Sequence, residues 1–220
     1  MREVDRIFNS LLGGGTHLPA GYERLEYITN PSTAYINTGV TYSADDLVEA
    51  HFENLTYSGT SWIGIFGTSK AVSSVWHRHI LAYDGMGVGT YQVLFGQSQQ
   101  NLASGTMGIT GVTLDMAYSN GSQSVTITDG GTTRIYTTSF TDESPVSLYP
   151  AFLFAYNRNG VASYHLDGSI GDFSLKVNGV KVCDYLPVRR LSDGKVGMYD
   201  LATATFKTSA SNVDFTAPNN

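Results

Sequence analysis

The side chains whose types and spacing come closest to acid–base chemistry lie at Glu49-x-His51-x-Glu53. Successive side chains of a β-strand point to opposite faces, so these three would share one face. Glycoside hydrolysis uses two carboxyl groups that lie roughly 5 to 9.5 Å apart. The rise of a strand separates Glu49 from Glu53 by about 13 Å. The pattern therefore favours a solvated outer face, and we expect no catalytic residue here.

A second unusual string is Trp76-His77-Arg78-His79. His77 and His79 would share one strand face and could bind one metal ion, but the sequence offers no third ligand nearby, so no metal site is expected. Sugar contact is the better functional interpretation, because a flat aromatic ring stacks on a pyranose while Arg, Asp and Asn side chains bind its hydroxyl groups. The candidate glycan-binding residues, chosen by residue type, are Trp76, Arg78, Tyr83, Asp84, Tyr91, Asn157, Arg158 and Asn159. The alternative for each aromatic side chain is a place in the hydrophobic core.

The patterns of several other kinds of site are missing from the sequence. No Asp-x-Asp-x-Asp run provides a calcium loop, no glycine-rich phosphate loop precedes a helical pattern, and no serine stands in a nucleophile elbow. Cys183 is the single cysteine, which excludes an intramolecular disulfide, and we expect a packed or edge thiol in a strand rather than a nucleophile. We therefore expect no cofactor; calcium stays open but without support.

The elements that position these residues follow a period of two from Leu18 onward, as in 48–53, where apolar and polar side chains alternate. Further strands are expected over 62–66, 75–83, 90–95, 111–118, 124–128, 133–138, 151–156, 168–177 and 180–186. Asn120-Gly121, Asp129-Gly130 and Asn178-Gly179 are expected as hairpin turns, because both residue types accept the positive φ that such turns require. About a dozen short antiparallel strands without intervening helices predict an all-β sandwich or jelly roll.

The first twelve residues break this pattern. Val4, Ile7, Phe8, Leu11 and Leu12 recur at the spacing of an amphipathic helix, which Gly13-Gly14-Gly15 ends. We therefore expect a helix over 1–12, a Gly-rich linker over 13–17 and a jelly-roll domain over 18–220. A helix this short is marginal alone in water, so its apolar stripe needs a partner. These five residues are candidates for anchoring in a larger assembly or for oligomerisation, for example as a trimeric bundle; packing back on the sandwich is the alternative.

The composition excludes several classes of protein. A chain of 220 residues that is 41% hydrophobic and only 15% charged is not disordered. Its net charge is −6 and its Lys and Arg residues are scattered, so no nucleic acid is expected as a partner. No apolar run approaches the roughly 18 residues of a membrane span. The chain opens with mixed charges rather than with a secretion signal.

The two ends of the sandwich region carry a resemblance to a known family. The opening has Leu18-Pro19-Ala20-Gly21-Tyr22, Leu25-Glu26-Tyr27-Ile28 and Tyr35-Ile36-Asn37-Thr38-Gly39. The close has Leu153-Phe154-Ala155, Gly168-Ser169-Ile170, Phe173-Ser174-Leu175, Asn178-Gly179, Leu186-Pro187-Val188-Arg189, Asp193-Gly194 and Gly197-Met198-Tyr199-Asp200. Over about 18–215 the chain resembles a concanavalin-like, laminin-G-like jelly-roll domain that occurs in tail and other virion proteins of phages infecting gut bacteria, and in surface proteins of those bacteria.

The resemblance implies a concanavalin-like (laminin-G-like) antiparallel β-sandwich jelly roll, here with a short N-terminal α-helix. The first and last strands of a jelly roll are neighbours, so the two matched ends describe one closing seam. Residues expected in this seam or in the core are Tyr27, Ile36, Tyr199 and Phe206. Pro187 is expected to stop the strand after Leu186, and Asp193-Gly194 is expected to return the chain.

The resemblance also implies a function. Glycosidases of this fold carry a Glu-x-Asp-x-x-Glu motif that the chain lacks, so we expect no enzyme. The expectation is a phage virion protein of the fibre or decoration type, assembled in the host cytoplasm and acting outside the cell. The helix would attach it to other virion proteins or to its own copies, and the jelly roll would adhere to host-surface or mucosal glycans. The alternatives are a structural decoration protein without a ligand, a bacterial surface adhesion module, and a glycan-processing enzyme.

Overall fold

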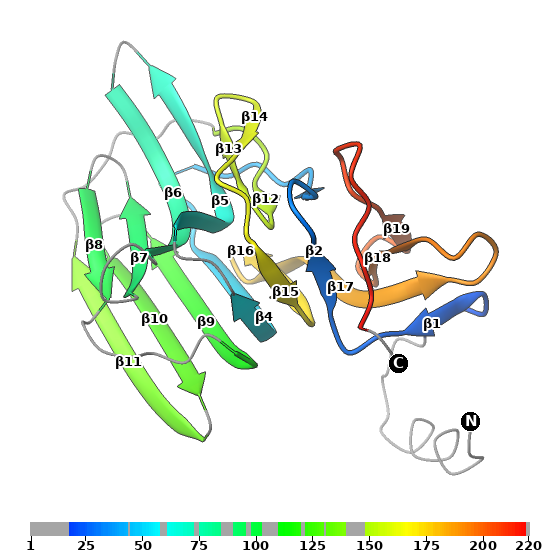
Figure 1. The fold of residues 1–220 in the computed structure, drawn as a ribbon. Coiled ribbons are helices and arrows are strands. Elements are labelled where there is room, and N and C mark those ends of the chain that lie inside the picture. Colours follow the sequence, from blue (N-terminus) through cyan, green and yellow to red (C-terminus); the bar gives the residue numbers. More distant parts are fainter. Residues whose placement is uncertain are drawn as a thin grey trace.

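The computed structural model describes residues 18–43, 45–57, 61–72, 75–84, 90–95, 98–102, 110–119, 122–129, 131–139 and 148–218. In these ranges the chain is all-β, and its strands form two sheets (Figure 1). The helix predicted over 1–12, with Val4, Ile7, Phe8, Leu11 and Leu12, and the linker over 13–17 lie outside the described residues. Within the same ranges there is no helix of the length and hydrophobicity that a membrane crossing requires.

The larger sheet has eleven strands among the described residues. They are β1 (Tyr22–Arg24), β2 (Ile28–Asn30), β4 (Val48–Tyr57), β9 (Val112–Ser119), β10 (Ser122–Asp129), β11 (Thr132–Ser139), β15 (Gly168–Ile170), β16 (Phe173–Val177), β17 (Val180–Arg190), β18 (Val196–Asp200) and β19 (Thr205–Lys207). The main path runs β11-β10-β9-β4-β16-β17-β18-β19, with β1 paired to β17 and β15 paired to β4 and β2. Strands from both ends of the sequence therefore build one sheet.

The smaller sheet has eight strands in the described part of the chain. They are β3 (Ile36–Asn37), β5 (Trp62–Val72), β6 (Val75–Asp84), β7 (Thr90–Phe95), β8 (Ser98–Leu102), β12 (Phe152–Leu153), β13 (Tyr156–Arg158) and β14 (Val161–Ser163). The order is β14-β13-β5-β6-β7-β8, with β12 paired to β5 and β3. Strand β13 runs parallel to β5, whereas its pairing with β14 is antiparallel.

The core lies between the two sheets, and β4 shows how the alternating sequence builds it. Val48, Ala50 and Phe52 are buried, while the residues between them face outward. The ring of Phe52 lies 6.1 Å from that of Phe66 in the other sheet and 5.1 Å from that of Phe173 in β16. These contacts confirm a β-sandwich.

The predicted closing seam is present. Strand β1 pairs antiparallel with β17, with Tyr22 opposite Arg190. The ring of Tyr22 packs 4.9 Å from that of Tyr199 and 5.5 Å from that of Phe206. Figure 1 shows the C-terminal end of the chain near β1. Both ends of the resemblance therefore meet in the structure, as the sequence predicted.

The prediction that Pro187 ends its strand is wrong. Strand β17 continues to Arg190, and Pro187 lies opposite Met198 of β18. A proline removes one backbone donor but keeps its carbonyl oxygen. That oxygen accepts a hydrogen bond of 2.9 Å from the N–H of Leu25, so the ladder passes through the proline.

Two predicted turns are confirmed. Asn178 and Gly179 have φ values of 52° and 77°, the positive φ at both central positions of a tight hairpin turn between β16 and β17. The Asp193-Gly194 turn returns the chain into β18, with Gly194 at φ 72°. Asn120, Gly121 and Gly130, from the other two predicted turns, lie outside the described residues.

Candidate functional site

Two of the predicted glycan-binding tyrosines belong to the core. Tyr83 of β6 and Tyr91 of β7 lie opposite each other and are 6% and 2% exposed. The ring of Tyr83 lies 4.8 Å from that of Tyr57 and 5.2 Å from that of Tyr91. Both face inward with Leu81, because alternate residues of β6 point to the same side. The prediction is wrong for both residues, and the core alternative holds.

Asn157 is also wrongly predicted as a sugar contact. It is 2% exposed, its Nδ2 donates to the Pro150 carbonyl at 2.9 Å, and its Oδ1 accepts from the Gly160 N–H at 2.7 Å. Asn159 is exposed at φ 52°, and its Oδ1 accepts from the Ala71 N–H at 2.8 Å. Asn157 therefore builds the turn after β13, and Asn159 joins that turn to β5.

Three further candidates lie on β6 and one on β13. Arg78 is half-buried, and Arg158 is exposed. Trp76 and Asp84 belong to the backbone of β6, but their side chains lie outside what the structure describes. Among the candidates whose side chains the structure describes, Arg78 and Arg158 are neither buried in the core nor part of a turn. Trp76 and Asp84 stay predictions.

The structure brings these two arginines together across β5. Ser69 lies opposite Arg78 of β6 on one side and opposite Arg158 of β13 on the other. Both arginines also lie near the hydroxyl of Tyr156: burial raises the pKa of that hydroxyl, and the positive charges of Arg158 and Arg78 partly oppose the rise. Arg78 and Arg158 therefore lie on either side of Ser69, on the outer side of the smaller sheet.

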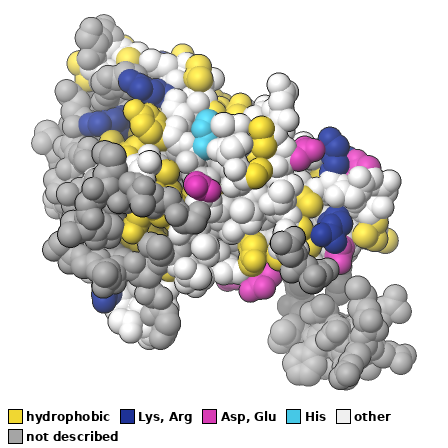
Figure 2. All heavy atoms as spheres, in the orientation of Figure 1, with side chains coloured by type: hydrophobic (Ala, Val, Ile, Leu, Met, Phe, Trp, Pro, Cys, Tyr) yellow, Lys and Arg dark blue, Asp and Glu magenta, His cyan; other side chains and the backbone are white. Residues whose placement is uncertain are grey.

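An aromatic cluster lies beside them. The rings of Tyr156 and Tyr164 stack at 5.6 Å with an interplanar angle of 9°. Trp62 meets both rings edge-on, at 5.9 Å from Tyr156 and 4.9 Å from Tyr164. Tyr164 is 48% exposed. We call the surface formed by Trp62, Tyr156, Tyr164, Arg78 and Arg158 the aromatic–basic face; Figure 2 shows basic side chains beside hydrophobic ones over the region of β5, β6 and β13.

Gly64 and Trp62 of β5 position these rings. A Cβ at Gly64 would lie 2.7 Å from the Tyr156 ring, so the glycine leaves space for that ring. The Gly64 N–H also donates to the Tyr164 carbonyl at 2.6 Å. Trp62 Nε1 donates to the Gln92 Oε1 at 2.5 Å, and Trp62 packs on a small apolar cluster formed by Ile80, Ala82, Leu94 and Tyr156. Trp62 and Tyr156 therefore lie in β5 and β13, whereas Tyr164 follows β14 and is held through its carbonyl oxygen.

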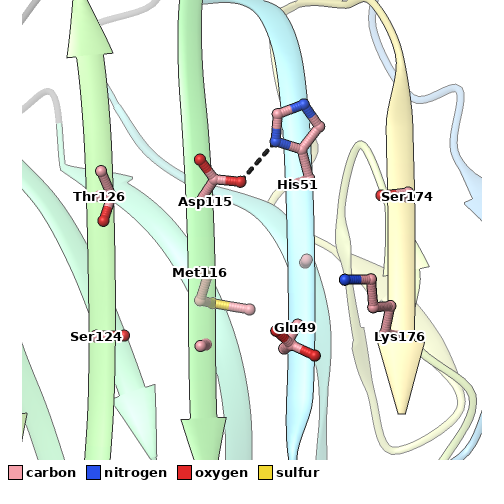
Figure 3. Close-up of a pocket in the computed structure, with 10 residues that line it drawn as sticks. Glu49, His51, Asp115, Met116, Ser124, Thr126, Ser174 and Lys176 are labelled. Atoms are coloured by element: carbon pink, nitrogen blue, oxygen red, sulfur yellow. Dashed lines mark hydrogen bonds and ion pairs between the residues drawn. The ribbon is translucent and has the colours of Figure 1, made fainter. Parts of the chain in front are cut away.

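A second surface lies on the outer side of the larger sheet (Figure 3). It is a pocket of about 230 Å³ over β4, β9, β10 and β16. We call it the polar pocket; its polar side chains are Glu49, His51, Asp115, Ser124, Thr126, Ser174 and Lys176. His51 lies opposite Asp115 and Ser174, and Glu49 lies opposite Lys176, so each row crosses the sheet.

His51 is held between two carboxylates. Its Nδ1 lies 2.6 Å from Asp115 Oδ1, and its Nε2 lies 3.3 Å from Glu53 Oε1. Burial lowers the pKa of His51, but the hydrogen bonds and charges of Asp115 and Glu53 together outweigh it, so the pKa is raised above 6.5. Only the imidazolium can donate to both carboxylates at once.

This arrangement predicts a pH-dependent contribution to stability. A pKa that is higher in the folded than in the unfolded chain stabilises the fold below about pH 6.5, and the contribution disappears as the pH rises through the folded value. Replacing His51 with Gln should therefore lower the free energy of unfolding more at pH 5 than at pH 9, by no more than about 1 kcal/mol because the pairs are exposed. Urea unfolding at both pH values measures this, with Ser174→Ala as the control on the neighbouring strand. An equal loss at both pH values would contradict the prediction.

The sequence correctly predicted an outward face at Glu49, His51 and Glu53, since the His51 and Glu53 side chains are 34% and 56% exposed. It missed Asp115 and Lys176, which come from strands far away in the sequence. It also missed Trp62, Tyr156 and Tyr164 as one cluster. In the sequence, Asp115 is one acidic residue in a strand of alternating apolar and polar residues. This pattern is too common to identify a site.

The described residues form neither a metal-binding cluster nor a reactive thiol. In the described ranges, no three His, Cys, Asp or Glu side chains gather closely enough to hold a metal ion. Cys183 is buried, as expected, and burial raises the pKa of its thiol to about 12. A thiol with this pKa is hardly ever the reactive thiolate near neutral pH.

Comparisons with known proteins give similarities at low identity. No family model matches the chain, and no curated protein matches it significantly. Among solved structures, tailspike protein 2 of Escherichia coli O157:H7 bacteriophage CAB120 is 14% identical over 76% of this chain and 27% of its own, with a TM-score of 0.45. The heptameric SAP-like pentraxin of Limulus polyphemus is 11% identical over 69% of this chain and 76% of its own, with a TM-score of 0.47.

The extracellular region of zebrafish Gpr126/Adgrg6 is 13% identical over 89% of this chain and 26% of its own, with a TM-score of 0.46. The chain thus spans about a quarter of the length of the tailspike and of the receptor region. With identities of 11% to 14% and TM-scores of 0.45 to 0.47, these similarities assign no function to this chain.

Proposed function

We propose that the protein is a non-catalytic glycan-binding protein, and that its binding surface is the aromatic–basic face. The observation that carries the proposal is the exposed ring of Tyr164, stacked on Tyr156 and beside Trp62, with Arg78 and Arg158 nearby. A ring face stacks on the apolar side of a pyranose, while guanidinium groups donate hydrogen bonds to its oxygens. Rings that are held by neighbouring strands lose little freedom on binding.

The biological setting forms part of the same proposal. The matched opening and closing motifs support display on a phage virion, where the helix expected over 1–12 would attach the protein to other virion proteins or to further copies of itself. A shallow sugar site binds weakly, but several copies on one particle would bind a glycan-coated surface tightly. Adhesion to host-surface or mucosal glycans would follow, with a purely structural decoration protein as the alternative.

The test is binding to a panel of bacterial capsular polysaccharides and mucin glycans, measured with the full chain in its assembled form. We expect saturable binding by the wild type and about tenfold weaker binding by Tyr164→Ala, a loss of about 1.4 kcal/mol. Tyr149→Ala is the matched control, because Tyr149 is 38% exposed but packs against Lys70, outside the ring cluster. Equal binding by the Tyr164 variant, or no binding to any glycan, would overturn the proposal.

A glycan-processing enzyme is the second candidate, and the polar pocket is the observation that favours it. Glu49 and Glu53 are too far apart along β4 to act as a pair of catalytic carboxyl groups, whereas Asp115 on the neighbouring strand adds a further carboxylate. His51 links Asp115 to Glu53. Release of reducing ends from the same panel measures this activity. Turnover that disappears in Asp115→Asn would assign catalysis to the polar pocket, whereas we expect background values for both proteins.

A further inference from the structure

We propose that the aromatic–basic face selects glycans that carry carboxylate groups, as uronic acid and sialic acid units do. This inference rests on the proposed glycan-binding function and adds the chemical class of sugar. It comes from the position of the two arginines and from the distribution of charge between the two sheets.

The first step is the spacing of the arginines. Arg78 and Arg158 lie on strands that flank β5, each opposite Ser69, so their backbones are two strand spacings apart. Two spacings amount to about 10 Å. Two arginine side chains reaching inward from that separation can meet on one sugar unit. The planar guanidinium group binds a carboxylate through two parallel N–H donors, and it keeps its charge at every physiological pH.

The second step is the local charge. The strands of the smaller sheet contain the basic residues Lys70, Arg78 and Arg158 but only one acid, Asp84, at the end of β6. The charges on the larger sheet are balanced instead: its strands contain seven Lys or Arg and seven Asp or Glu residues, and the polar pocket has Glu49 and Asp115 beside Lys176. The whole chain has a net charge of −6, so a basic face on it is a local feature rather than a result of composition. Such a face attracts anionic ligands.

The third step is the contribution of the rings. A carboxylated pyranose still has an apolar side, which can stack on the exposed Tyr164 ring while its carboxylate meets the arginines. Tyr164 and Arg158 both belong to the segment that contains β13 and β14, and Gly64 of β5 fixes that segment through the Tyr164 carbonyl. One sugar unit can therefore use both kinds of contact.

The experiment compares each glycan with its own uncharged form. One arm uses a glucuronate-containing capsular polysaccharide before and after chemical reduction of its carboxyl groups. The other arm uses sialylated mucin before and after sialidase treatment. One of the two arms contains the class of acidic sugar that the protein recognises. In that arm we expect at least tenfold weaker binding to the neutralised form, and the affinity for the charged form should decrease steeply with added NaCl. A loss in the first arm identifies uronic acids, and a loss in the second identifies sialic acids.

The variants test the arginines themselves. Arg158→Gln and Arg78→Gln should each weaken binding to the charged glycan about tenfold. They should weaken binding to the neutralised form by a smaller factor, because only hydrogen bonds to uncharged oxygens are lost there. An equal loss for both forms would contradict carboxylate selection. Arg158→Lys keeps the charge but loses the two parallel donors, so it should lie in between. Lys70→Gln is the control for the loss of one positive charge. Lys70 follows Ser69 in β5, so it points to the other side of the sheet from Arg78 and Arg158 and lies over the ring of Tyr149. Thermal unfolding confirms that each variant is folded.

Two outcomes separate this inference from the function on which it rests. Equal binding to the charged and neutralised glycans, still lost in Tyr164→Ala, would overturn carboxylate selection and keep glycan binding. No binding to any form would overturn both.

Discussion

Replacing Phe52 with Ala is expected to lower the free energy of unfolding by about 3–5 kcal/mol, the range for removing a buried aromatic ring. Phe52 is fully buried in the middle of β4, and its ring contacts Phe66 of the other sheet and Phe173 of the neighbouring strand. The cavity would lie where the two sheets meet, and aromatic rings on both sides would lose contacts. Urea unfolding followed by circular dichroism measures the change.

The matched control is Val180→Ala. Val180 also lies in the larger sheet but is 64% exposed, so its truncation should change the free energy of unfolding by less than about 0.5 kcal/mol. A loss below about 1 kcal/mol for the Phe52 variant would contradict the position of its ring between the sheets. If the loss has the expected size, the variant stays folded only when the free energy of unfolding of the wild type is larger than this loss.

Replacing Asp200 with Ala is expected to cost about 3 kcal/mol of the free energy of unfolding. Asp200 is 2% exposed at the end of β18. Its Oδ1 accepts from the backbone N–H groups of Asp184 and Ala202, both at 3.0 Å, and its Oδ2 accepts from Thr203 Oγ1 at 2.6 Å. Hydrogen bonds to a charged group contribute about 1.5–3 kcal/mol each, and removing the acceptor leaves backbone donors unpaired.

Asp200→Asn is the informative comparison. Asn has nearly the same shape and keeps one carbonyl oxygen, so it can still accept from the two backbone N–H groups and should lose less than half as much stability. Thermal and urea unfolding of both variants give the difference. An Asp200→Ala variant with an unchanged free energy of unfolding would contradict the structural role of this side chain in the turn that leads from β18 to β19.

The sequence by itself determined the all-β class and, in strands with clear alternation, the side that faces the core. In β4 the alternation of apolar and polar residues correctly placed Phe52 inside and His51 outside. The Asn178-Gly179 turn was also predictable, since its positive φ values follow from two residue types. These features were accessible because they depend on a few consecutive residues and on backbone geometry. Pro187 shows the limit, because the carbonyl contact that keeps it in a strand comes from Leu25, far away in the chain.

Only the tertiary structure decided which residues share a surface. Tyr83 and Arg158 were equally good sugar candidates by type, but one faces the core and the other faces solvent. Trp62 and Tyr164 come from distant parts of the chain, and His51 meets Asp115 through the pairing of β4 with β9. The physical reason is that strand order and register are set by hydrogen bonds and packing between remote segments. A shift of one residue would move every side chain of a strand to the opposite face.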